Sequence, residues 1–150
     1  MGRAPDPWRA GTDRGSRVGL NDCHYCSSAH SACAAAQLPG GMALVEQIRA
    51  DADTAPVSAK LKALLAIAAA VSHSGHNVTA QGAAKAREAG ATDLEIHDTV
   101  LIAAAFCMFN RYVDGLATIA PDDPAVYATR AQRLVMDGYL MPTAEPTREG

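Results

Sequence analysis

One long segment in the second half of the chain constrains the fold most. Residues 93–118 begin in the pattern "TDLE" (Thr92 to Glu95) and contain the apolar run "VLIAAAFCMF" (Val100 to Phe109). A threonine followed three residues later by a glutamate marks a helix start. A helix that is apolar on nearly every face lies in the middle of a bundle or between subunits. Because 150 residues offer little interior to cover it, we expect a helical bundle that assembles into a homo-oligomer.

The rest of the chain also has helical character. Hydrophobic residues make up 49% of the sequence, but aromatic residues only 5%. An alanine-rich, aromatic-poor composition favours close-packed helices over a sheet, and no segment alternates convincingly between apolar and polar residues. The pattern predicts an all-α fold of about six helices, over about residues 22–37, 42–51, 59–73, 80–90, 93–118 and 124–137.

The domain organisation follows from where this helical character begins and ends. Residues 1–19 carry arginines, glycines and prolines without periodicity, which is typical of a disordered or atypical N-terminal arm. Residues 142–150, "PTAEPTREG", have the composition of a disordered tail. We therefore expect one helical domain over residues 20–141.

Charge and hydropathy bear on partners and location. A formal net charge of -3 provides no electrostatic footprint for nucleic acid or for an anionic membrane. The apolar runs are shorter than the ~20 residues needed to cross a bilayer, and the first twenty residues hold no secretory apolar segment. We expect a cytoplasmic protein, and in that compartment a C-x-x-C pair usually indicates metal binding or catalysis rather than a structural disulfide.

The segment "CHYCSSAH" contains the residues best suited to chemistry. Cys23, Cys26 and His30 are spaced i, i+3 and i+7, so a helix would project them from one face. The start of a helix favours a thiolate, because free N–H groups and the helix dipole stabilise negative charge. His30 could take the proton of Cys26, and Cys23 could then resolve the oxidised Cys26 by forming a disulfide.

Two other interpretations of these residues remain open. Zinc is one, since Cys33 lies along the same stripe. However, Cys23 and Cys33 are about 15 Å apart at ~1.5 Å per residue, so one straight helix cannot wrap all these ligands around one ion. We therefore expect no metal and no organic cofactor. The other interpretation is that these residues are buried or incidental.

The motif C-x-x-C-x-x-x-H in an all-helical chain of this size resembles the AhpD-like (alkylhydroperoxidase-like) branch of the carboxymuconolactone decarboxylase family. The resemblance continues in "LPGG", "SHSGHNVT" and "AGATDLEIHDTVLIAAAFCMFNRYVDGLA", and covers roughly Leu20 to Ala117. It implies an all-α bundle that assembles as trimers or hexamers and reduces hydroperoxides or disulfides. It also implies that Cys26 is the peroxide-reactive thiol, that Cys23 donates a proton and closes the disulfide, that His30 is the relay base, and that an external dithiol resets the pair.

The chain departs from the family pattern at two places. The pattern has a glutamate twelve residues before the first cysteine, where this chain has Gly11, and a histidine directly before the second cysteine, where this chain has Tyr25. One hypothesis is that residues 1–19 are not the family's own segment, through a truncated start or a shifted reading frame. Two other functions are then possible: a catalytically weakened paralogue that acts as a structural or binding subunit, or a decarboxylase-type enzyme, against which the C-x-x-C argues.

Overall fold

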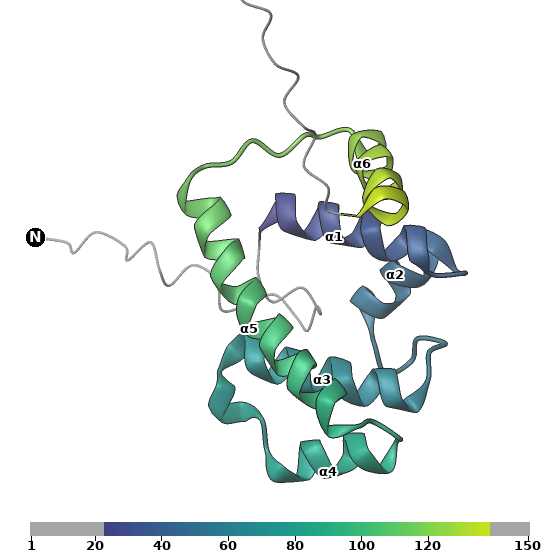
Figure 1. The fold of residues 1–150 in the computed structure, drawn as a ribbon, viewed down its shortest axis with the longest axis vertical. Coiled ribbons are helices and arrows are strands. Elements are labelled where there is room, and N and C mark those ends of the chain that lie inside the picture. The colour runs from purple at the N-terminus through teal and green to yellow at the C-terminus, as the bar shows by residue number, and fades with distance from the viewer. Residues whose placement is uncertain (1–22, 139–150) are drawn as a thin grey trace, which may run out of the picture.

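The computed structural model describes residues 23–138, and within this range it contains six α-helices, one short 3-10 helix and no strand (Figure 1). The all-α prediction is therefore confirmed. The predicted arm (1–19) and tail (142–150) lie outside the described residues. The helices are α1 (His24–Gln37), α2 (Gly41–Ala50), α3 (Ala59–His73), η1 (Gly75–Asn77), α4 (Ala80–Glu88), α5 (Asp93–Gly115) and α6 (Pro124–Asp137).

Side-chain caps fix most of the helix starts. The predicted capping box of α5 is present: the Glu95 N–H donates to Thr92 Oγ1 at 3.1 Å, and the Thr92 N–H donates to Glu95 Oε2 at 2.7 Å. Ser58 caps α3 through its hydroxyl, which accepts a hydrogen bond from the Leu61 N–H at 3.1 Å. Three boundaries differ from the prediction by two or three residues: α1 begins at His24, with Cys23 as its N-cap, α4 ends at Glu88, and α5 ends at Gly115.

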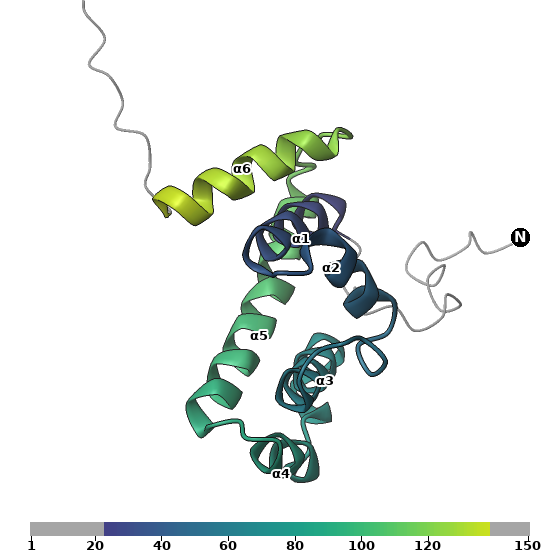
Figure 2. The same ribbon diagram turned by 90° about the vertical axis from the view of Figure 1, so that its right-hand side faces the viewer.

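The helices form two small packed groups (Figure 2). The first group consists of α3, α4 and the N-terminal half of α5, around a core of Ala63, Ile67, Ala86, Ala91 and Ile96. In the second, α6 lies across α1 around Ala32, Tyr127 and Ala131, and α2 packs on the other side of α1. Neither core is large, so much of the packing between the groups depends on α5.

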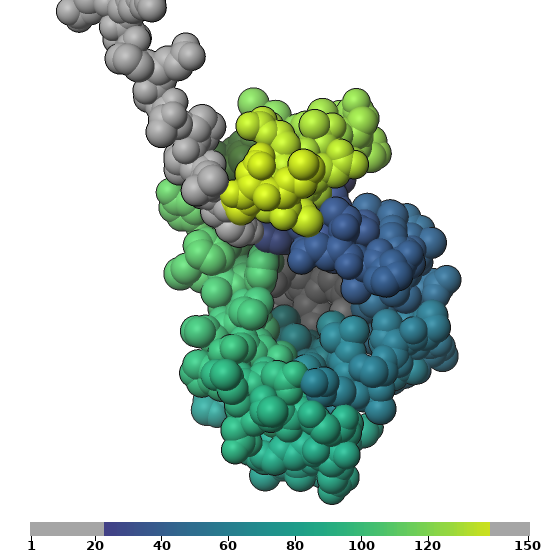
Figure 3. Space-filling model, turned by 45° about the vertical axis from the view of Figure 1, so that its right-hand side comes forward, coloured from purple at the N-terminus to yellow at the C-terminus, as the bar shows by residue number. Residues whose placement is uncertain are grey.

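Helix α5 connects the two groups. Its 23 residues span about 34 Å at 1.5 Å per residue, and it runs along one side of the molecule past α3 and on to α1 (Figure 3). Six of its large hydrophobic side chains are more than half exposed: Leu94, Leu101, Ile102, Met108, Phe109 and Tyr112. A single chain therefore does not bury α5. Across residues 23–138, no helix is both long enough and apolar enough to span a membrane.

Candidate dithiol site

Two buried thiols meet at the N-terminal end of α1. Cys23 is 1% exposed and Cys26 is 8% exposed, and both are free cysteines. The Cys23 thiol donates to Cys26 Sγ at 3.0 Å, while the Cys26 backbone N–H donates to Cys23 Sγ at 3.5 Å. Cys23 thus caps the helix with its sulfur, and this cap holds the two sulfurs together. A disulfide would require them to approach by only about 1 Å.

A carboxylate from another helix reaches this pair. The side chain of Asp114, in the last turn of α5, is a second acceptor for the Cys23 proton. Burial, and then this hydrogen bond, raise the pKa of Cys23 from 9.0 to about 12, because both favour the protonated thiol over a buried anion. Cys23 is therefore a thiol at neutral pH. Asp114 itself is exposed, so it links a buried thiol to solvent.

His30 lies one turn beyond Cys26, on the side of α1 that faces α5. Its imidazole packs edge-on against Phe106, with ring centroids 4.5 Å apart and an interplanar angle of 84°. Partial burial lowers the pKa of His30, so the ring is mainly neutral at neutral pH. Within residues 23–138 no hydrogen bond reaches the ring, neither from Cys26 nor from a carboxylate. The structure thus brings the sulfurs of Cys23 and Cys26 together, but among the described residues it shows no hydrogen bond between them and His30.

Three residues spaced about one helical turn apart lie on the face of α5 that meets α1. Phe106, Asn110 and Asp114 are spaced i, i+4 and i+8, so they form one stripe. The stripe touches α1 at both ends, through Phe106 on His30 and Asp114 on Cys23. Asn110 is therefore placed across from the turn that carries Cys26.

Asn110 is the one buried polar residue of the described chain, at 7% exposure. Its Oδ1 accepts no hydrogen bond from residues 23–138. A buried amide oxygen without a donor is unfavourable, and such positions are often found at sites that bind another group. The motifs in the sequence singled out neither Asp114 nor Asn110 as a member of the site. Both could have been found as the polar members, with Phe106, of one i, i+4, i+8 stripe.

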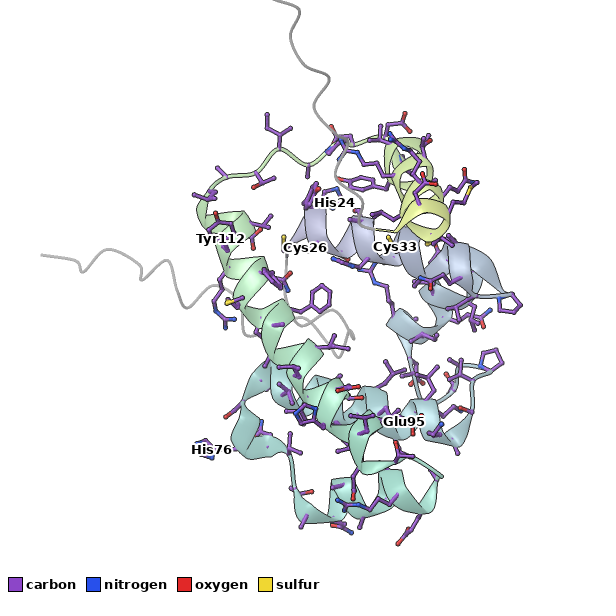
Figure 4. All side chains as sticks on the ribbon, viewed as in Figure 1. His24, Cys26, Cys33, His76, Glu95 and Tyr112 are labelled. Atoms are coloured by element: carbon purple, nitrogen blue, oxygen red, sulfur yellow. The ribbon has the colours of Figure 1, made fainter. Side chains whose placement is uncertain are left out.

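The other candidate side chains lie elsewhere (Figure 4). Cys33 packs with the core between α1 and α6, and His76 and Glu95 are at the opposite end of the molecule from Cys26. In the part of the chain that the structure describes, no three His, Cys, Asp or Glu side chains are grouped so as to hold a metal ion. A cavity of about 340 Å³ lies between α3 and α4, and its lining includes four alanines together with Lys62, Lys85 and Asn77. It is separate from the thiols.

The comparisons with known proteins give one match. The model of the carboxymuconolactone decarboxylase family matches residues 39–120, which is more than half of the chain. No curated protein and no solved structure matches it. The matched range contains α2 to α5, and thus Phe106, Asn110 and Asp114, whereas Cys23, Cys26 and His30 precede it.

Proposed function

Because the chain belongs to the carboxymuconolactone decarboxylase family, we propose that it is a thiol-dependent oxidoreductase of the AhpD-like branch, which reduces hydroperoxides or disulfides through Cys23 and Cys26. The family match is compatible both with decarboxylase-type and with peroxidase-like enzymes. The observation that carries the redox function is the pair of free, buried thiols with sulfurs 3.0 Å apart at the start of α1. A cytoplasmic location would keep such a pair reduced.

Cys26 is the proposed nucleophile. Cys23 is held as a thiol by burial and by Asp114, which leaves Cys26, in the first turn of α1, as the sulfur available to attack a substrate. The Cys26 thiolate attacks the outer oxygen of a hydroperoxide. The S–O bond forms, the O–O bond breaks and the alcohol leaves with a proton, so sulfur is oxidised to a sulfenic acid and the peroxide is reduced.

Cys23 completes the cycle. Its sulfur attacks Cys26, the S–S bond forms, and the sulfenic oxygen leaves as water. An external dithiol then reduces the Cys23–Cys26 disulfide by thiol–disulfide exchange and itself becomes a disulfide. A small disulfide substrate would be reduced by the dithiol form of the same pair. Neutral His30, one turn away, is the proposed relay for the proton that Cys26 releases.

One observation favours a second candidate function. Among the described residues no carboxylate orients His30 or stabilises its charged form, and partial burial lowers its pKa. A relay histidine without such a partner is a weaker base. The chain would then be a catalytically weakened paralogue that serves as a structural or binding subunit.

A turnover assay distinguishes the two functions. Hydroperoxide consumption is measured with dithiothreitol as the reductant, for the parent protein and for Cys26→Ser, Cys23→Ser and Cys33→Ser. We expect turnover in the parent and in Cys33→Ser, which alters a cysteine packed on α6, and loss of turnover in the other two. A parent protein no faster than its Cys26→Ser variant would contradict the redox function and support the binding subunit.

We also propose that the chain forms a homo-oligomer, a trimer or hexamer, through α5. Its exposed apolar residues include the stripe Leu94, Leu101, Met108, Tyr112 and Leu116, and such a stripe on a small protein is typical of a subunit contact. Sedimentation of the parent and of Met108→Glu tests this. A parent that sediments as a monomer at micromolar concentration would contradict it.

A further inference from the structure

We propose that Asp114 is the base that takes the proton from Cys23 when Cys23 closes the disulfide with Cys26. This inference rests on the proposed function, because it assigns one step of that cycle. It is carried by the register of α5 against α1, which sets Asp114 beside Cys23 as it sets Phe106 on His30, by the exposure of Asp114 next to a thiol that is 1% exposed, and by the interaction of the Asp114 side chain with Cys23.

The two acceptors beside the Cys23 thiol support this assignment. A thiol has a single proton, and the proton of Cys23 has two acceptors, Cys26 Sγ at 3.0 Å and the carboxylate of Asp114. Once Cys26 is oxidised, its sulfur is the electrophile and no longer a suitable acceptor. When the Cys23 proton is directed to Asp114, a lone pair of the Cys23 sulfur is free to attack Cys26. The carboxylate is thus the acceptor that remains at the moment of closure.

The difficulty of ionising Cys23 explains why a base is needed. A thiol with a pKa of about 12 is ionised in only about one molecule in 10⁴ at pH 8. The ionisable groups that act on Cys23 from the described elements are Cys26 on α1 and Asp114 on α5. Only Asp114 is exposed and can pass the proton on to water.

In the closure step one proton leaves Cys23 and one electron pair leaves Cys26. The Cys23 proton moves to Asp114 as the Cys23–Cys26 bond forms, and the group on Cys26 leaves with the bonding electron pair. From a sulfenic acid this group is hydroxide, which departs as water after taking one proton. From a mixed disulfide it is a thiolate, and the proton on Asp114 is released to solvent.

The test isolates closure from peroxide chemistry. Ellman's reagent converts Cys26 of the full-length protein to its thionitrobenzoate mixed disulfide, and closure is followed by acid quenching and mass mapping of the Cys23–Cys26 disulfide. The proteins are the parent, Asp114→Asn, Asp114→Glu and, as a matched control, Asp98→Asn. Asp98 is an exposed carboxylate on the same helix, about 24 Å from Asp114 along the axis at 1.5 Å per residue.

We expect closure in Asp114→Asn to be about 10- to 100-fold slower than in the parent, within the usual range for loss of a general base. Its rate should rise about tenfold per pH unit between about pH 6.5 and 8.5, because Cys23 must then ionise unaided, while the parent changes little over that range. Asp114→Glu should close faster than Asp114→Asn but more slowly than the parent, and Asp98→Asn should close at the parent rate.

Closure in Asp114→Asn at the parent rate and with the parent pH profile would overturn the inference. A merely structural role for Asp114 would slow closure without making it depend on pH, and this result would also overturn it. Because no peroxide is used, a protein that closes rapidly through Asp114 but never consumes hydroperoxide would contradict the peroxidase function and leave this assignment supported.

Discussion

The imidazole of His30 packs edge-on against Phe106, with ring centroids 4.5 Å apart, and this contact ties α1 to the stripe of α5 that also carries Asp114. Partial desolvation lowers the pKa of the imidazole, and Phe106 is the ring packed against it. We therefore expect Phe106 both to position the proposed relay and to contribute to its desolvation.

Replacing this aromatic ring should change the titration of His30. In Phe106→Ala we expect the pKa of His30 to rise toward 6.5. We also expect the free energy of unfolding to fall, but by less than the about 3–5 kcal/mol typical of a fully buried phenylalanine, because Phe106 is only half-buried. NMR titration of the imidazole measures the first effect. Phe109→Ala is the matched control, since Phe109 is on the same helix but 51% exposed. An unchanged His30 pKa in Phe106→Ala would contradict this role.

The raised pKa of Cys23 predicts slow alkylation. At about pH 8, iodoacetamide should modify Cys23 at least about 100-fold more slowly than half-buried Cys33, because the thiolate is the reactive form and each pKa unit is a tenfold change in its population. Peptide mapping over time measures both rates in one sample. Equal rates at Cys23 and Cys33 would contradict the raised pKa.

The same pKa sets a pH dependence of stability. The folded state holds a proton on Cys23 up to about pH 12, whereas the unfolded chain loses it near 9.0. The contribution of Cys23 to the free energy of unfolding is therefore fully present below pH 9 and is lost as the pH rises toward 12. Urea unfolding at about pH 8 and pH 10 should show a smaller pH effect in Cys23→Ala than in the parent. An identical pH effect in both proteins would contradict it.

The unpaired oxygen of Asn110 predicts an unusual substitution effect. Leucine has nearly the same shape as asparagine, and replacing a buried polar group that lacks a donor by an apolar one is neutral or stabilising. We expect Asn110→Leu to unfold at the parent's urea midpoint or above it, and Asn110→Ala to lose about 1–3 kcal/mol by leaving a cavity. Strong destabilisation by leucine would indicate that the amide is fully bonded in the protein.

The capping box of α5 predicts a local loss of stability. Removing the Thr92 hydroxyl in Thr92→Ala should lower the free energy of unfolding by about 1 kcal/mol, since it leaves the Glu95 N–H without its acceptor. Thr118→Ala, an exposed threonine after the end of α5, is the control and should change it by less than about 0.5 kcal/mol. Equal effects of the two substitutions would contradict a stabilising cap.

The helices were predictable because their signals are local. The "TDLE" cap, Ser58 before α3 and Pro124 at the start of α6 each depend on residues within one turn, so the chain could be divided correctly without knowledge of the packing. The sequence predicts α5 three residues too long, because the chain turns at Ala117, whose left-handed φ of 49° no glycine at that position marks.

The site was harder to predict because it depends on contacts between distant segments. The C-x-x-C spacing predicted that Cys23 and Cys26 would meet, since both belong to one helix start. The approach of Asp114 to Cys23, and of Phe106 to His30, depends on how α5 crosses α1, which no local pattern specifies. The family pattern has a carboxylate upstream of the cysteines, whereas in the described residues the carboxylate beside Cys23 is Asp114, on a later helix.

The central claim is that Cys23 and Cys26 form a peroxide-oxidised pair, and mass spectrometry of the intact protein tests it most directly. After one equivalent of hydroperoxide, we expect the parent to lose the mass of two hydrogens, with the change mapping to a Cys23–Cys26 disulfide, and Cys26→Ser to lose none. A Cys26→Ser variant that reacts with hydroperoxide as fast as the parent, or a parent whose mass does not change, would contradict it.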